Sequence, residues 1–201
     1  MFTALRATSL TLRGLLRSEF AATPLLAPSF VAGGGMTVNL ATPQEMLTAG
    51  DTGISLWLYR IVRDEQRLNM SPTRVGLDRE QRAPLPLRLH YLITPLADGN
   101  RAVEMEQALM GRVLQTFHDI PIVEGALLRD DFAGTGARLT VRLESHGVEE
   151  ITRVWDALER PYQLCVSYEV SVVLVDSHRP LQPVPPVRSA SVETGVAERL
   201  P

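Results

Sequence analysis

The spacing of apolar residues changes several times along the chain, and each change marks an expected element. Residues 54–62 are β-branched, aromatic or otherwise apolar on both alternating faces, which is typical of a central strand covered on both sides. Residues 85–93 alternate strictly. Pro86 indicates either that this strand lies at a sheet edge or that it starts in the extended conformation before pairing begins, because proline has no N–H to donate. We also expect strands at residues 36–40, 139–143 and 162–175.

Three segments show helical spacing instead. Apolar residues recur three or four positions apart in residues 102–117 and again in residues 148–158. Residues 1–17 contain arginines, serines and threonines but no acid, a composition shared with transit peptides. The apolar stripe of this segment nevertheless continues past Glu19 to Phe20, which favours a packed N-terminal helix over a targeting sequence.

The order of these elements predicts an α+β fold, with a single domain built on a mixed, mainly antiparallel sheet of about four to five strands and helices packed on it. Residues 1–53 are expected to form the N-terminal helix and a connecting segment. Residues 54–176 would form the α+β core, and residues 177–201 a proline-rich, extended C-terminal tail.

Residues 63–82 mix arginines with acids and include Pro72 and Gly76, which predicts an exposed loop. Loops of this length inside a compact domain are usually functional or disordered. We place intermolecular contacts on this loop and on the exposed sheet edges, since the arginine fork pairs bidentately with carboxylates of a facing subunit. The candidate interface residues are Arg67, Arg74, Arg79 and Arg82. A solvated loop without contacts is the alternative.

The composition narrows the classes of function. The 201 residues are 45% hydrophobic and 21% charged, as in an ordinary globular domain. The formal charge of −3 gives no general attraction to nucleic acid or anionic lipid, so neither is an expected partner. All 20 basic residues are arginine, which excludes lysine-based catalysis. The single cysteine, Cys165, cannot form an internal disulfide and indicates a reducing compartment.

Candidate catalytic chemistry is sparse. The histidines lie far apart in the chain, without the spacing of a metal site. The glycines at residues 33–35 and 134–136 lack the context of a phosphate-binding loop, and no serine occupies a nucleophile elbow. We therefore expect no catalytic, cofactor-binding or metal-binding residues. The sequence indicates a structural protein of a larger assembly and not an enzyme.

Five ordered blocks of the sequence resemble one family: the N-terminal domain of the tail-terminator, or cap, proteins of extracellular contractile injection systems, of the antifeeding-prophage and virulence-cassette type. The first block, GISLWLYRI at residues 53–61, is followed by PLPLRLHYLIT at residues 84–94. The remaining blocks are residues 109–119, 148–158 and 161–168. No block is a functional signature by itself, but their order makes the resemblance specific.

The resemblance implies a tail-terminator-like fold and a structural role. Such a protein forms a ring, expected to be a hexamer, at the distal end of the inner tube and sheath, and it fixes the length of the particle. Its expected partners are copies of itself, the inner tube protein and the sheath protein. It would assemble in the cytoplasm and then remain part of the phage tail-like particle. Two alternatives stay open: a phage or prophage tail-completion protein, and a small-molecule enzyme.

Overall fold

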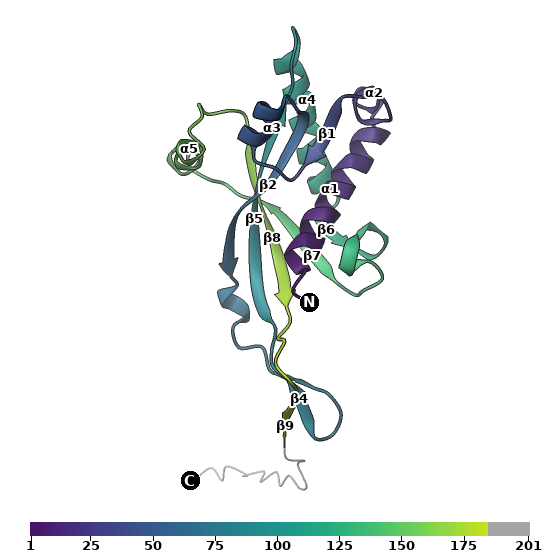
Figure 1. Ribbon diagram of the computed structural model, residues 1–201, viewed down its shortest axis with the longest axis vertical. Helices are drawn as coiled ribbons and strands as arrows, with labels where there is room; N and C mark the ends of the chain where they lie inside the picture. Colours follow the sequence, from purple (N-terminus) through teal and green to yellow (C-terminus); the bar gives the residue numbers. More distant parts are fainter. Residues whose placement is uncertain (185–201) are drawn as a thin grey trace, which may run out of the picture.

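The computed structural model describes residues 1–184, apart from the side chain of Val172. Figure 1 shows an elongated molecule in which helices surround the upper part of a twisted sheet and long strands continue downward into a narrow arm. In spatial order the strands of the main sheet are β1 (Met36–Asn39), β2 (Thr52–Arg63), β5 (Leu85–Leu96), β8 (Val166–Val175), β7 (Arg138–Leu143) and β6 (Ile122–Glu124).

The pairing of the strands confirms the predicted fold class. β1 runs parallel to β2, and every other neighbouring pair in this sheet is antiparallel. The sheet is therefore mixed and mainly antiparallel, with six strands in place of the four to five expected. The additional strand is the short β6, whose three residues show no alternation long enough to be detected.

Two long helices cover one face of the sheet. α1 (Ala4–Ala22) and α4 (Ala102–Asp119) place their apolar stripes on it, as the helical spacing predicts. Leu16 and Phe20 of α1 and Val113 of α4 are fully or almost fully buried in the same core as Tyr91 of β5. The N-terminal stripe is therefore a packing face of the domain.

A short helix on the other face lies within residues 1–53, where only a connecting segment was expected after the N-terminal helix. α3 (Pro43–Ala49) begins with a capping box: the Thr42 hydroxyl accepts from the Glu45 N–H at 3.1 Å, and the Glu45 carboxylate accepts from the Thr42 N–H at 2.8 Å. Pro43 occupies the first helical position, where its missing N–H costs nothing. A second short helix, α2 (Ala27–Phe30), follows α1.

The structure departs from the expectations for two strands. β2 is buried on both faces only in its first half, and Ile61 is 48% exposed. β5 lies inside the sheet between β2 and β8, so an edge position is wrong, whereas its pairing with β2 does begin after Pro86, at Leu87. The Pro86 carbonyl accepts from the Asp64 N–H at 2.9 Å, so the missing N–H faces the end of β2, where the ladder stops.

Most of residues 63–82 are exposed, as predicted, although Asp64 is buried, and the segment is not an irregular loop. It contains a 3₁₀ turn, η1 (Glu65–Arg67), and a hairpin of β3 (Thr73–Arg74) and β4 (Arg79–Gln81). β9 (Gln182–Pro183) of the predicted tail adds a third strand beside β4, and this small sheet is the arm at the bottom of Figure 1. The remainder of the tail prediction lies outside the described residues.

The segment between β7 and β8 leaves the sheet. It carries α5 (Val148–Ala157), which Figure 1 shows standing away from the body of the protein. Of the predicted apolar stripe only Trp155 is buried, while Val148 is 81% exposed. Two further 3₁₀ turns, η2 (Gly125–Leu127) and η3 (Asp130–Phe132), join β6 to β7. No helix within the described residues combines the length and the apolarity needed to cross a membrane.

Candidate assembly surfaces

The four arginines proposed as interface anchors all lie on or beside the arm. Arg67 ends η1, Arg74 and Arg79 lie in the two strands of the hairpin, and Arg82 directly follows β4. All four side chains are exposed, and within residues 1–184 none of them forms an ion pair. The structure separates them into different surroundings, because Arg67 lines one cavity and Arg82 another.

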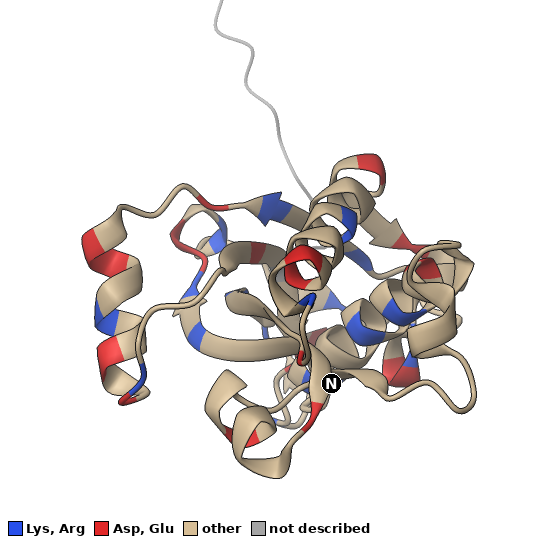
Figure 2. Cartoon of the chain, turned by 90° about the horizontal axis from the view of Figure 1, so that it is seen from above, with Lys and Arg blue, Asp and Glu red and all other residues tan. Residues whose placement is uncertain are grey.

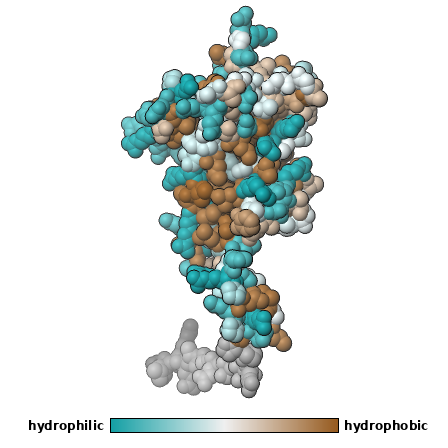
Figure 3. Space-filling model, viewed as in Figure 1, coloured by the Kyte–Doolittle hydropathy of each residue, from teal (hydrophilic) through white to brown (hydrophobic). Residues whose placement is uncertain are grey.

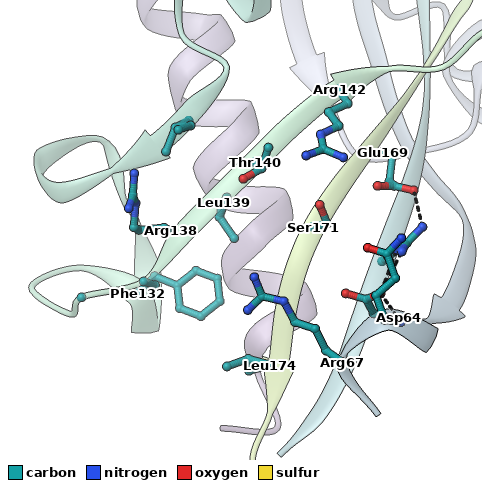
Figure 4. A pocket seen from close by; sticks show the side chains of 15 residues that line it. Asp64, Arg67, Phe132, Arg138, Leu139, Thr140, Arg142, Glu169, Ser171 and Leu174 are labelled. Atoms are coloured by element: carbon teal, nitrogen blue, oxygen red, sulfur yellow. Dashed lines mark hydrogen bonds and ion pairs between the residues drawn. The ribbon is translucent and has the colours of Figure 1, made fainter. Parts of the chain in front are cut away.

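The cavity that Arg67 lines is a groove of about 560 Å³ on the face of the sheet opposite α1. We call it the outer groove. Strands β7 and β8 supply Thr140, Arg142 and Ser171 to it, and apolar side chains such as Phe132 line it as well. In Figure 4, Arg67 extends from η1 across β8, and Arg142 approaches Ser171 from the other end. No sequence pattern indicated that Arg142 and Arg67 share a cavity, because the two residues belong to elements far apart in the chain.

One side of the outer groove is held by a chain of ion pairs. Arg88 donates to Asp64 with an Nη2–Oδ1 distance of 2.8 Å, and its Nη1 lies 3.5 Å from Oε2 of Glu169. The Asp64 side chain is only 4% exposed and also accepts from the Gln66 N–H, which anchors η1. The hydrogen bond to Asp64 raises the pKa of Arg88. Both acidic residues of the groove are thus engaged with Arg88.

A buried polar network connects the sheet to the segment that leads into α5. His90 of β5 lies 2.9 Å, Nδ1 to Oε1, from Glu144, and Ser167 donates to the other carboxylate oxygen at 2.6 Å. The Tyr59 hydroxyl lies 3.0 Å from that of Ser167 and 3.3 Å from Nε2 of His146. These contacts fix the start of the projecting segment to the sheet.

The charge of Glu144 is set by opposing effects. Burial alone would raise the pKa of this carboxyl, but hydrogen bonds from Ser167 and His90, with the nearby His146, hold it below the ordinary value of 4.5. Glu144 is therefore an ionised carboxylate at neutral pH.

His90, Glu144 and Glu169 could together hold a metal ion, since one ligand atom from each lies within 4.8 Å of the others. The spacing of these residues in the chain gave no sign of this, because the sheet register brings them together. The carboxylates already have partners within the chain, in Ser167 and Arg88. The geometry is accounted for by these hydrogen bonds and ion pairs.

An unpaired strand edge lies above the arm. β2 has no partner on its outer side beyond Ser55, so residues 56–63 form a free edge of the main sheet within the described chain. Figure 3 shows apolar surface in the middle of the molecule, where the lower parts of the long strands lie. Ile61 and Leu85, 48% and 44% exposed, belong to these strands. A free edge beside apolar surface can accept a strand from another chain.

A second, more apolar cavity of about 660 Å³ lies between α4 and the end of β7. Leu114 and Phe117 of α4 face Leu143 and Tyr168 across it. Burial raises the pKa of Tyr168 to about 12, so its hydroxyl stays protonated at physiological pH.

The single cysteine lies near the end of α5. The half-buried thiol of Cys165 accepts a hydrogen bond from the Trp155 indole at 3.3 Å, and burial raises the pKa of the thiol. The cysteine thus acts as a packing residue.

Charge is not concentrated on one side of the protein. Figure 2 shows acidic and basic residues interspersed along its helices and strands, which agrees with the small formal charge of −3. A polyanion therefore finds no extended basic surface among the described residues.

Comparisons with known proteins give a consistent picture. The family described as the Pvc16 N-terminal domain matches residues 7–189. The chain has the fold of the PVC sheath/tube terminator of an extracellular contractile injection system, with a TM-score of 0.51, 20% identity, and coverage of 92% of this chain and 64% of that one. It also resembles the tube-terminating cap of the anti-feeding prophage, with a TM-score of 0.50, 20% identity, and coverage of 78% and 53%.

The matches cover only part of the two solved structures. The chain spans 64% of the length of the sheath/tube terminator and 53% of the length of the tube-terminating cap. A comparison with curated proteins found no match.

Proposed function

The chain belongs to the Pvc16 N-terminal domain family, and we propose that it is a tail terminator, which closes the distal end of the tube and sheath of a contractile injection particle and fixes its length. The observation that carries this proposal is the family match over residues 7–189, joined by a fold shared with a sheath/tube terminator and a tube-terminating cap. Injection-system relatives favour this function over the completion of a phage tail.

A terminator of this kind acts as a closed ring. Cyclic symmetry gives every copy the same contacts and leaves no open end at which the assembly could continue to grow. We propose a hexamer that contacts the inner tube protein and the sheath protein. The protein would assemble in the cytoplasm and travel with the particle.

The exposed surfaces described above are suited to such contacts. The arm presents Arg67, Arg74, Arg79 and Arg82 without partners in the described chain, and arginine pairs well with carboxylates of a facing subunit. The free edge of β2 offers backbone hydrogen bonds to a strand from a neighbour. We propose that both surfaces take part in capping.

Deletion of the gene tests the function. We expect tube and sheath proteins to be produced at normal levels, while tubes become variable in length or sheaths detach, as seen by electron microscopy of purified particles. Re-expression of the intact chain should restore a uniform length. Particles of normal, uniform length in the deletion strain would show that the protein is not the terminator.

A further inference from the structure

Two arginines share the outer groove without any acidic partner among the described residues. The acids that line this groove, Asp64 and Glu169, both contact Arg88, and Arg138 pairs with Glu124 at 2.6 Å. Arg67 and Arg142 form no ion pair or side-chain hydrogen bond within residues 1–184. Both guanidinium groups are therefore available to an anion from outside the described chain.

We infer that the outer groove binds a single carboxylate side chain, Asp or Glu, of a partner protein. The inference rests on the proposed function, because the partner it addresses is a subunit of the particle. Arg67 and Arg142 supply two guanidinium forks from opposite ends of the groove (Figure 4). The hydroxyls of Thr140 and Ser171 line the same cavity and can donate to the bound oxygen atoms.

The groove suits a single carboxylate on a side chain better than a chain of phosphates. Its lining includes the apolar residues Phe132, Leu139 and Leu174, which can pack against the stem of a side chain. Glu169 and Asp64 border it and would repel additional negative charges at the margin. The chain as a whole has a formal charge of −3, which disfavours extended polyanions.

The ion chain gives the groove a fixed shape. Arg88 ties Asp64, at the start of η1, to Glu169 of β8, and Arg67 is the last residue of η1. The backbone of Arg67 is thus held by contacts of Asp64, three residues earlier. A receptor held in place before binding loses less entropy when its ligand arrives.

The first experiment is an NMR titration of the purified chain, at low ionic strength, with a short capped peptide that contains one glutamate and no other charged residue. We expect amide shifts centred on Thr140 and Ser171, and binding that weakens as salt is added. The variant R67Q/R142Q should bind at least about tenfold more weakly, because it lacks both guanidinium groups that form charge-assisted hydrogen bonds with the carboxylate. The matched control is R74Q/R79Q, which removes two exposed arginines from the hairpin and should bind like the parent.

Three outcomes would overturn the inference. Equal binding by R67Q/R142Q and the parent would place the peptide elsewhere. A loss of the same size in R74Q/R79Q would show a general charge effect. Inorganic phosphate that binds the groove as strongly as the peptide would show an unspecific anion site.

The second experiment separates this inference from the proposed function. Particles are assembled with the R67E/R142E variant and compared with the gene deletion. Irregular particles in both cases support the groove as a contact of the terminator. Irregular particles in the deletion but normal ones with R67E/R142E would refute the groove and leave the function intact. Normal particles in the deletion would refute the function, and the peptide titration would then decide the groove by itself.

Discussion

The hydroxyl groups of Ser9 and Tyr91 lie 2.8 Å apart in the buried contact between α1 and the sheet. The two residues are separated by 82 positions in the chain. Ser9 also lies 3.1 Å from the Leu5 carbonyl, to which its hydroxyl donates, so that the Tyr91 hydroxyl can donate to Ser9. Burial raises the pKa of Tyr91 well above its ordinary value, which keeps this donor protonated.

This hydrogen bond predicts that Y91F destabilises the parent protein but stabilises the S9A variant. Y91F alone should lower the free energy of unfolding by about 1 kcal/mol, since Ser9 keeps the Leu5 carbonyl as a partner. S9A leaves a buried tyrosine hydroxyl unpaired, which costs about 1–3 kcal/mol, offset by about 0.5 kcal/mol of helix propensity. In the S9A background, Y91F should therefore stabilise the protein. Urea denaturation of the four proteins measures this, and a further loss in the double variant would contradict the assignment.

Gly53 is required where β1 meets β2. Its φ is +121°, and a Cβ atom there would lie 2.0 Å from the carbonyl oxygen of Thr37, its partner in the parallel pair. G53A should lower the free energy of unfolding by at least about 3 kcal/mol, because backbone must move to make room. The control is G111A in α4, where a Cβ meets open space; it should raise stability by up to about 1 kcal/mol. Thermal unfolding distinguishes the two, and a neutral G53A would refute the close approach.

The lowered pKa of Glu144 predicts that the protein loses stability in acid. Its folded pKa lies below the ordinary value of 4.5, so the native state binds fewer protons than the unfolded state in this range. The stabilisation is complete above pH 4.5 and is lost as the pH falls through the lower, folded value. E144Q should cost about 1–3 kcal/mol at pH 7 and flatten the dependence below pH 4.5. The exposed Glu149→Gln control should keep the parent's profile, and an unchanged profile in E144Q would reject the role given to the network.

We predict that the four arginines on or beside the arm contribute to capping and not to the stability of the domain. R67S/R74S/R79S/R82S should leave the domain folded, since exposed substitutions usually change stability by no more than about 0.5 kcal/mol each. Capping should weaken, seen as irregular particle lengths in electron micrographs. Four exposed arginines outside the arm provide the matched control, R13S/R17S/R153S/R160S. If the arm variant assembles uniform particles as the parent does, the contacts lie on other surfaces.

Long periodic segments carried most of the fold information in the sequence. α1, α4, β5 and β7 appear where the spacing of apolar residues predicts them, because each has a continuous apolar stripe or face that packs in the core. The short elements were missed for a physical reason. The hairpin strands have two and three residues, too few for an alternation to be detected, and β9, which pairs with β4, lies about a hundred positions later.

α3 is different, because a local signal for it was present. Thr42 followed three residues later by Glu45, with Pro43 between them, is a helix start that reads as a break when only the proline is considered. The outer groove had no such signal. Arg67 and Arg142 belong to different elements, and they face one cavity because the Arg67 side chain extends from η1 across β8.

The position of α1 has a consequence for the synthesis of the chain. α1 packs against η3 and β8, and the Met1 amine pairs with Asp176, 175 positions away. The ribosome adds about 5–20 residues per second, so on the order of ten seconds pass between the synthesis of α1 and that of β8, which completes the cover of the apolar stripe. Nascent chains that stop short of β8 leave part of this stripe exposed and are expected to bind chaperones or aggregate. The domain should consequently complete its folding only late in translation, with the slow kinetics of contacts between distant parts of a chain.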